Sequence, residues 1–167
     1  MKDSPFGITT YCDDIRYELG GKLTLVGCYI GEMTAYGTAP IMLPTFCALV
    51  NFRASKALNF TEISVVLSQD TNGVIKELAK ASLIAPENSS IEVSDSEISE
   101  TQLALSIPFK LTALVVGANC FIRCRAYIDD IEVKLGSIAI NIAEISTMNP
   151  ELDPFTPATS APHTPRP

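Results

Sequence analysis

The sequence predicts an all-β protein that folds as a single antiparallel β-sandwich. Short segments in which apolar and polar residues alternate recur from Ile8 to Ile142, and this alternation is typical of half-buried strands. Turn-forming pairs separate several of these segments, namely Gly20-Gly21, Asn72-Gly73 and Asp129-Asp130. Eight or nine short strands with such turns between them indicate a sandwich of the immunoglobulin-like or C2-like kind.

The N-terminal region contains the clearest hairpin signal. Residues 7–13 alternate as a strand, and two apolar segments within residues 12–29 meet at Gly20-Gly21. The second of these segments is apolar on both faces, which predicts an interior strand. Residues 31–44 are rich in Gly, Thr, Ala and Pro, so we expect a connecting loop there.

The middle of the chain contains three further strand candidates. Residues 45–53 and 60–68 alternate in the manner of strands. The Asn72-Gly73 pair then predicts a two-residue turn into a returning strand over residues 74–83. Most of that last segment also suits a short helix by propensity, and the preceding turn favours the strand.

The C-terminal third begins with an acidic run over residues 86–100, where we expect an exposed loop. A strand over residues 103–109 follows, and another over residues 119–128 turns at Asp129-Asp130 into a last apolar segment. In the strand before that turn, Arg123 and Arg125 should face outward. The inward face should hold Cys120, Ile122, Cys124, Ala126 and Ile128.

The composition changes near the C-terminus, where prolines become frequent. Such a segment buries too little apolar surface to offset its ordering entropy. We therefore expect a sandwich domain over residues 1–146 and an extended or disordered tail over residues 147–167. The tail has PxxP spacings that suit the aromatic-lined groove of a partner, formed by Pro154, Pro157, Pro162 and Pro165. The alternatives are a plain tether and a virion-type anchoring arm.

One stretch resembles a known family. The run CDDIRYELGGKLTLVGCYIGEM spans residues 12–33 and contains Asp13-Asp14-Ile15-Arg16, Gly20-Gly21-Lys22, Gly27 and Gly31. It resembles the opening signature of an uncharacterised bacterial family of small all-β proteins, a domain of unknown function. The resemblance thins to a pattern of strands through about residue 143 and does not cover the tail. It implies a β fold and supplies no functional residues.

Charge and hydropathy argue against several classes of partner. A net charge of −7 disfavours nucleic acid, because binding a phosphate backbone depends on clustered Lys and Arg. The N-terminus lacks the apolar region of a signal peptide, and no apolar run reaches the length of a membrane span. We therefore expect a cytoplasmic protein without membrane contact, or a virion protein if the gene belongs to a phage.

The residues that usually carry catalysis are sparse. Five cysteines occur without a CxxC spacing, which favours buried, reduced thiols. The single histidine, His163, lies in the tail, where a zinc site or a histidine-activated nucleophile would lack a rigid support. The sequence therefore predicts no enzyme activity and no cofactor.

Two pairs of acidic residues remain as candidate ligands. Asp13, Asp14, Asp129 and Asp130 would suit calcium if the fold gathered them at one end of the sandwich. Their alternative role is in turns, because aspartate tolerates turn conformations and hydrogen-bonds the local backbone.

The glycines and the arginine of the first hairpin have a structural interpretation. We expect Arg16 to pair with a neighbouring carboxylate and pin the hairpin. Gly20 and Gly21 are the expected turn positions of the same hairpin, and Gly27 is expected in its second strand.

The leading functional hypothesis is a non-enzymatic protein-interaction or scaffold module. The alternative is a self-assembling structural component, such as a bacteriophage particle protein, in which a terminal arm lies across a neighbour. A sandwich that binds calcium or a small ligand through the aspartates is the third hypothesis.

Overall fold

The computed structural model describes residues 4–55, 60–84 and 102–144, and these residues form ten strands and no helix. The strands are β1 (Phe6–Cys12), β2 (Asp14–Tyr17), β3 (Leu23–Val26), β4 (Glu32–Tyr36), β5 (Ile41–Ser55), β6 (Glu62–Thr71), β7 (Val74–Ile84), β8 (Gln102–Val116), β9 (Cys120–Ile128) and β10 (Ile131–Ala143). The predicted all-β sandwich is confirmed, with ten strands in place of the eight or nine expected.

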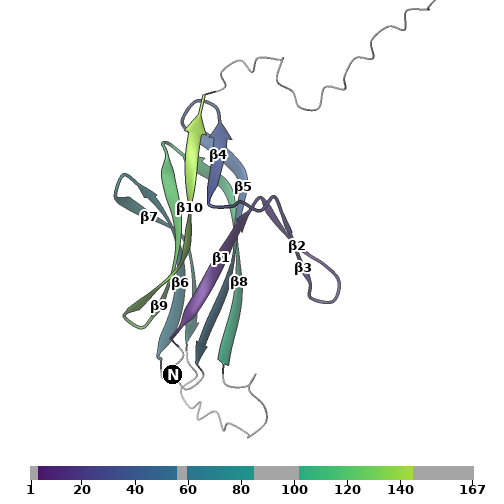
Figure 1. Ribbon diagram of the computed structural model, residues 1–167, viewed down its shortest axis with the longest axis vertical. Helices are drawn as coiled ribbons and strands as arrows, with labels where there is room; N and C mark the ends of the chain where they lie inside the picture. The colour runs from purple at the N-terminus through teal and green to yellow at the C-terminus, as the bar shows by residue number, and fades with distance from the viewer. Residues whose placement is uncertain (1–3, 56–59, 85–101, 145–167) are drawn as a thin grey trace, which may run out of the picture.

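The strands are arranged in two larger sheets and one small one (Figure 1). The three-stranded sheet has the order β1-β5-β8, and the five-stranded sheet has the order β4-β10-β9-β6-β7. Strands β2 and β3 form a separate two-stranded hairpin that stands off the side of the sandwich. Every pairing is antiparallel apart from that of β4 with β10, which is parallel.

The main core lies between the two larger sheets, because each contributes an apolar face. In β9 the predicted inward residues Cys120, Ile122, Cys124, Ala126 and Ile128 are all buried. From the other sheet, β5 contributes Phe46, Ala48, Val50, Phe52 and Ala54. The Tyr11 hydroxyl donates a hydrogen bond to the Gly136 carbonyl at 3.2 Å and so connects β1 to β10.

The predicted turns at Asn72-Gly73 and Asp129-Asp130 are present. Asn72 and Gly73 join β6 to β7 with φ of 53° and 85°, and the segment that follows is a strand and not a helix. Asp129 joins β9 to β10 with a φ of 49°. Turn chemistry thus predicts both of these hairpins correctly.

The expected loop over residues 31–44 is wrong. It contains β4 and the first residues of β5. β4 is stabilised by parallel pairing with β10, in which Glu32 lies beside Ala139. Pro44 fits inside β5 because the pairing of β1 with β5 begins only at Cys47, so the missing proline amide costs no bond to β1.

The expected interior strand after Gly20-Gly21 is also wrong, although the hairpin itself forms. β3 pairs only with β2. Its Leu25 packs instead on the outer face of β5, against a second, smaller core made of Cys12, Ile15, Cys47 and Leu49.

Several predictions fall on residues that the structure does not describe. They are the acidic loop over residues 86–100, the tail over residues 147–167 with its four PxxP prolines, and His163. Within the described ranges, no helix has the length and apolar character needed to cross a bilayer.

Candidate functional site

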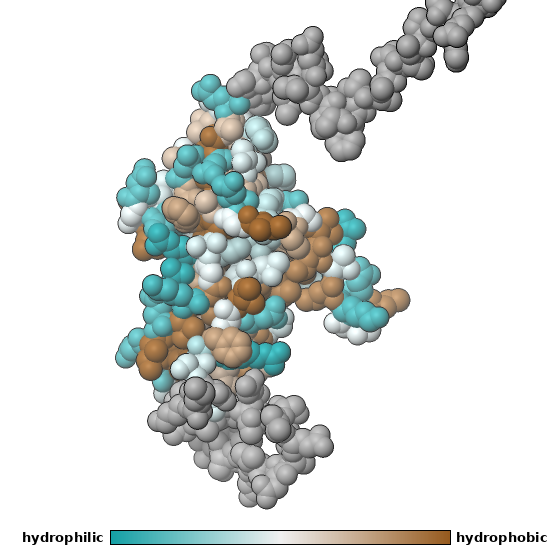
Figure 2. Space-filling view, in the orientation of Figure 1, coloured by the Kyte–Doolittle hydropathy of each residue, from teal (hydrophilic) through white to brown (hydrophobic). Residues whose placement is uncertain are grey.

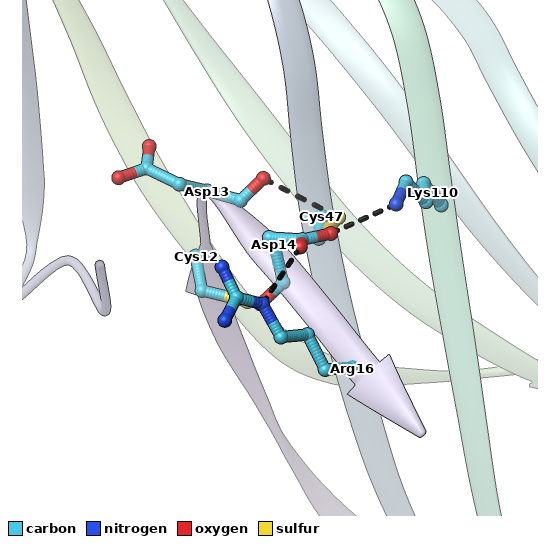
Figure 3. Close-up of polar contacts among 6 residues, drawn as sticks. All are labelled: Cys12, Asp13, Asp14, Arg16, Cys47 and Lys110. Atoms are coloured by element: carbon cyan, nitrogen blue, oxygen red, sulfur yellow. Dashed lines mark hydrogen bonds and ion pairs between the residues drawn. The ribbon is translucent and has the colours of Figure 1, made fainter. Parts of the chain in front are cut away.

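The base of the β2-β3 hairpin gathers most of the residues that the sequence singles out. The chain leaves β1 at Cys12, passes through Asp13 and enters β2, which lies over the outer face of β5 (Figure 3). The small core beneath it is apolar, and Ile15 is only 5% exposed. A two-stranded hairpin is marginally stable by itself in water, so this core is what holds it in place.

Asp13 connects the two ends of the hairpin. Its amide donates to the carbonyls of Val26 and Gly27 at 3.0 and 3.3 Å, and its carboxylate accepts a hydrogen bond from the Tyr29 hydroxyl. Gly27 has a φ of 65°, and a Cβ at this position would overlap the Asp13 carboxylate. The geometry therefore requires glycine at position 27.

Asp14 attaches the hairpin to a distant strand. Its carboxylate accepts from the Lys110 ammonium of β8 at 2.8 Å and from the Arg16 guanidinium at 3.4 Å (Figure 3). The hydrogen bond from Lys110, followed by the contact with Arg16, holds the pKa of Asp14 below its ordinary value. The same contact raises the pKa of Lys110. The charge of Asp14 thus has a structural role, because it links the hairpin to β8.

Two buried thiols lie beneath these carboxylates. The Cys12 thiol donates to the Asp14 carbonyl at 3.5 Å, and the Cys47 thiol donates to the Asp13 carbonyl at 3.7 Å. Burial raises the pKa of Cys12 to about 11 and also raises that of Cys47, so both are protonated at neutral pH. Cys120 and Cys124 are buried too, whereas Cys28 is exposed, contrary to the expectation that all five are buried.

The structure does not bring the two aspartate pairs together. Asp129 accepts hydrogen bonds from the amides of Thr61 and Glu62, both at 3.0 Å, at the β9-β10 turn. Figure 1 places that turn well away from the junction of β1 and β2, where Asp13 and Asp14 lie. Among the described residues, no three His, Cys, Asp or Glu side chains form a group suited to a metal ion.

The hairpin exposes large apolar side chains. Leu19 is 97% exposed and Tyr17 is 74% exposed, and Ile30, just beyond β3, is 95% exposed. Figure 2 shows hydrophobic surface on the protruding hairpin, interrupted by hydrophilic patches. The sequence reveals the apolar residues, but only the fold shows that they lie on an element that projects from the body.

Sequence reasoning also missed a polar hollow on the outer face of the five-stranded sheet. Asp70 pairs with Arg123 at 2.7 Å, and the Arg123 guanidinium lies 5.8 Å from the Phe121 ring centroid. The hollow has a volume of about 310 Å³, and Asn119 and Asn141 also line it. The outward direction of Arg123 is predictable from alternation, whereas its partner on another strand is not.

The comparisons with known proteins add no assignment. No family model matches the chain, and a search of curated proteins finds no significant match. The resemblance of residues 12–33 to an uncharacterised bacterial family remains an expectation from the sequence.

Proposed function

We propose that this protein is a non-enzymatic interaction module and that it docks onto a partner protein through the β2-β3 hairpin. The observation that carries the proposal is the position of Tyr17 and Leu19, which are exposed on an element that stands off the sandwich (Figure 1). Exposed apolar side chains gathered on one element are typical of an interaction site.

The hairpin is anchored to the sandwich at its base and exposes its loop. The small core and the bond from Lys110 to Asp14 both lie at its base, while the loop between β2 and β3 extends into solvent. A pre-positioned hairpin loses less conformational entropy on binding than a free loop does. A partner with an apolar recess would therefore receive the Tyr17 and Leu19 side chains at low entropic cost.

The ionisable groups at the base favour a structural role over a catalytic one. Asp14 is neutralised by two cations, and Asp13 is engaged by Tyr29 and by the hairpin backbone. The Cys12 and Cys47 thiols have raised pKa values, so neither is a thiolate at neutral pH, which disfavours a role as a rapid catalytic nucleophile. These groups hold the hairpin in place, which supports a binding module.

The test uses one substitution on the hairpin and one matched substitution elsewhere. Leu19→Asp places a charge on the hairpin loop without disturbing any core, whereas Ile131→Asp does the same at the β9-β10 turn, where Ile131 is 64% exposed. The wild-type protein is used to capture partners from native lysate, and a purified candidate is then titrated by calorimetry.

We expect Leu19→Asp to weaken binding at least tenfold, about 1.4 kcal/mol, and Ile131→Asp to leave it unchanged. Equal effects of the two substitutions would mean that the hairpin is not the docking element. Failure to recover any reproducible partner would count against the whole proposal.

A second copy of the same chain is the alternative partner, as in a self-assembling structural component such as a bacteriophage particle protein. A groove of about 400 Å³ runs between the edge strands β7 and β8, lined in part by Leu78, Leu111, Leu114 and Val115. Insertion of one hairpin into this groove of the next copy would build a ring or an open chain of subunits. Light scattering that shows a monomer at high protein concentration would exclude this alternative.

A further inference from the structure

Three cysteines lie side by side on neighbouring segments at the hairpin base. In the pairing of β1 with β5, Cys12 stands directly opposite Cys47. On the other side of β1, the Tyr29 amide donates to the Tyr11 carbonyl at 2.9 Å and the Asp13 amide bonds the Gly27 carbonyl. Residues 27–29 therefore run antiparallel to residues 11–13, and this register places Cys28 beside Cys12.

This arrangement suits disulfide formation. Residues directly opposite in antiparallel strands have Cα atoms about 4.5–5.5 Å apart and side chains on the same face. A disulfide spans Cα distances of about 4.4–6.8 Å. Cys12 and Cys47 share one small core, and both Cys47 and Cys28 act electrostatically on Cys12, which raises its pKa further beyond the effect of burial.

The three thiols differ in access to solvent. Cys12 and Cys47 are 0% exposed, whereas Cys28 is exposed. We propose that Cys28, Cys12 and Cys47 form a thiol relay, in which Cys28 takes up a disulfide from a small-molecule disulfide in solution and passes it to the buried Cys12–Cys47 pair.

The relay consists of three thiol–disulfide exchanges. The Cys28 thiolate attacks the small-molecule disulfide, forms a mixed disulfide and releases one equivalent of the small thiol. Cys12 then attacks the Cys28 sulfur and releases the second equivalent. Cys47 finally attacks the Cys12 sulfur and returns Cys28 to the thiol. In total, Cys12 and Cys47 lose two electrons and two protons, and the small-molecule disulfide gains them.

Oxidation of the pair would loosen the hairpin. The Cys12 and Cys47 thiols donate to the Asp14 and Asp13 carbonyls, and a disulfide has no hydrogen to donate. Both carbonyls at the start of β2 would then lose a donor. If the hairpin is the docking element proposed above, the relay regulates that docking, and this consequence alone rests on the proposed function.

The relay is tested on the full chain with oxidised glutathione as the probe. After exposure, the protein is unfolded, its free thiols are alkylated, and the cysteines are mapped by mass spectrometry after cleavage both between Cys12 and Cys28 and between Cys28 and Cys47. We expect the alkylated cysteines to fall from five to three, with a Cys12–Cys47 link. Cys120 and Cys124 serve as internal controls, because the residues opposite them are Ile140, Gly136 and Leu67.

Two variants separate the steps. Cys28→Ser should yield the same link about tenfold more slowly, and Cys47→Ser should stop at a Cys12–Cys28 disulfide. Oxidation of Cys28→Ser at the wild-type rate would overturn the relay, and absence of the Cys12–Cys47 link in the wild type would overturn the site.

Hydrogen exchange of residues 14–26 should be faster after oxidation, and unchanged exchange would overturn the coupling to the hairpin. None of these measurements involves the partner, so their failure is distinct from failure of the proposed docking.

Discussion

At the scale of single residues, the hairpin base depends most directly on Gly27. We expect Gly27→Ala to lower the free energy of unfolding by about 2–4 kcal/mol, because a left-handed backbone costs an L-residue about 1–2 kcal/mol and the Asp13 carboxylate must also leave Tyr29. Urea denaturation followed by far-ultraviolet circular dichroism measures this loss.

Gly31 provides the matched control for Gly27. Its φ is 80°, and a Cβ added there would meet no atom within 4 Å beyond its chain neighbours. Gly31→Ala should therefore lose only the backbone contribution of about 1–2 kcal/mol. If the two substitutions destabilise the protein equally, the close approach of Gly27 to Asp13 is not what requires glycine.

The residues of the site divide by how far apart their partners lie in the chain. Arg16, Gly20, Gly21 and Gly27 belong to one continuous stretch, and local turn chemistry is enough to assign them to a hairpin. Lys110 is 96 residues away from Asp14, and Cys47 is 34 residues away from Asp13. No local pattern connects such residues, because the contact exists only after the sheets have formed.

At the scale of the element, the hairpin should behave as a unit that opens independently of the sandwich. Ile15 fills the small core between the hairpin and β5. Ile15→Ala should destabilise the hairpin by about 2 kcal/mol, the low end for a buried large-to-small change, and so accelerate amide exchange there about 30-fold. Exchange in β9, within the main core, should stay unchanged. The measurement is hydrogen–deuterium exchange read by mass spectrometry.

The control for this prediction is Ile131→Ala, because Ile131 is largely exposed at the far β9-β10 turn. It should accelerate exchange in neither region. Equal acceleration of β9 and the hairpin by Ile15→Ala would show that the hairpin and the sandwich unfold together, which contradicts two separate cores.

The strands themselves were predictable to different degrees. β6, β9 and β10 alternate clearly, and β7 is predicted from the Asn72-Gly73 turn that precedes it. β4 was missed because its Gly- and Pro-flanked sequence has little strand character, and its pairing partner β10 lies about a hundred residues further along. β3 was misplaced because an apolar strand looks the same whether it is interior to a sheet or packed on the outside of one.

At the scale of the whole molecule, buried cysteine thiols and a buried tyrosine hydroxyl should make the fold sensitive to alkali. Burial raises the pKa of Cys12 to about 11 and also raises the pKa of Tyr11 and Cys124. In the unfolded chain these groups have their ordinary pKa values of about 8.5 for cysteine and 10 for tyrosine. Above about pH 8.5 the unfolded state therefore binds fewer protons than the folded state, and stability falls as pH rises.

The expected result is a melting temperature that is nearly level from pH 7 to 8 and declines from pH 9 to 11. Cys12→Ser removes one of the buried ionisable groups, so the variant should show a shallower decline over the same range, whatever its melting temperature at pH 7. Ile131→Ala removes no ionisable group and should leave the decline unchanged. Differential scanning calorimetry in reducing buffer measures all three proteins. Parallel declines for Cys12→Ser and the wild type would show that ionisation of Cys12 does not contribute to alkaline unfolding.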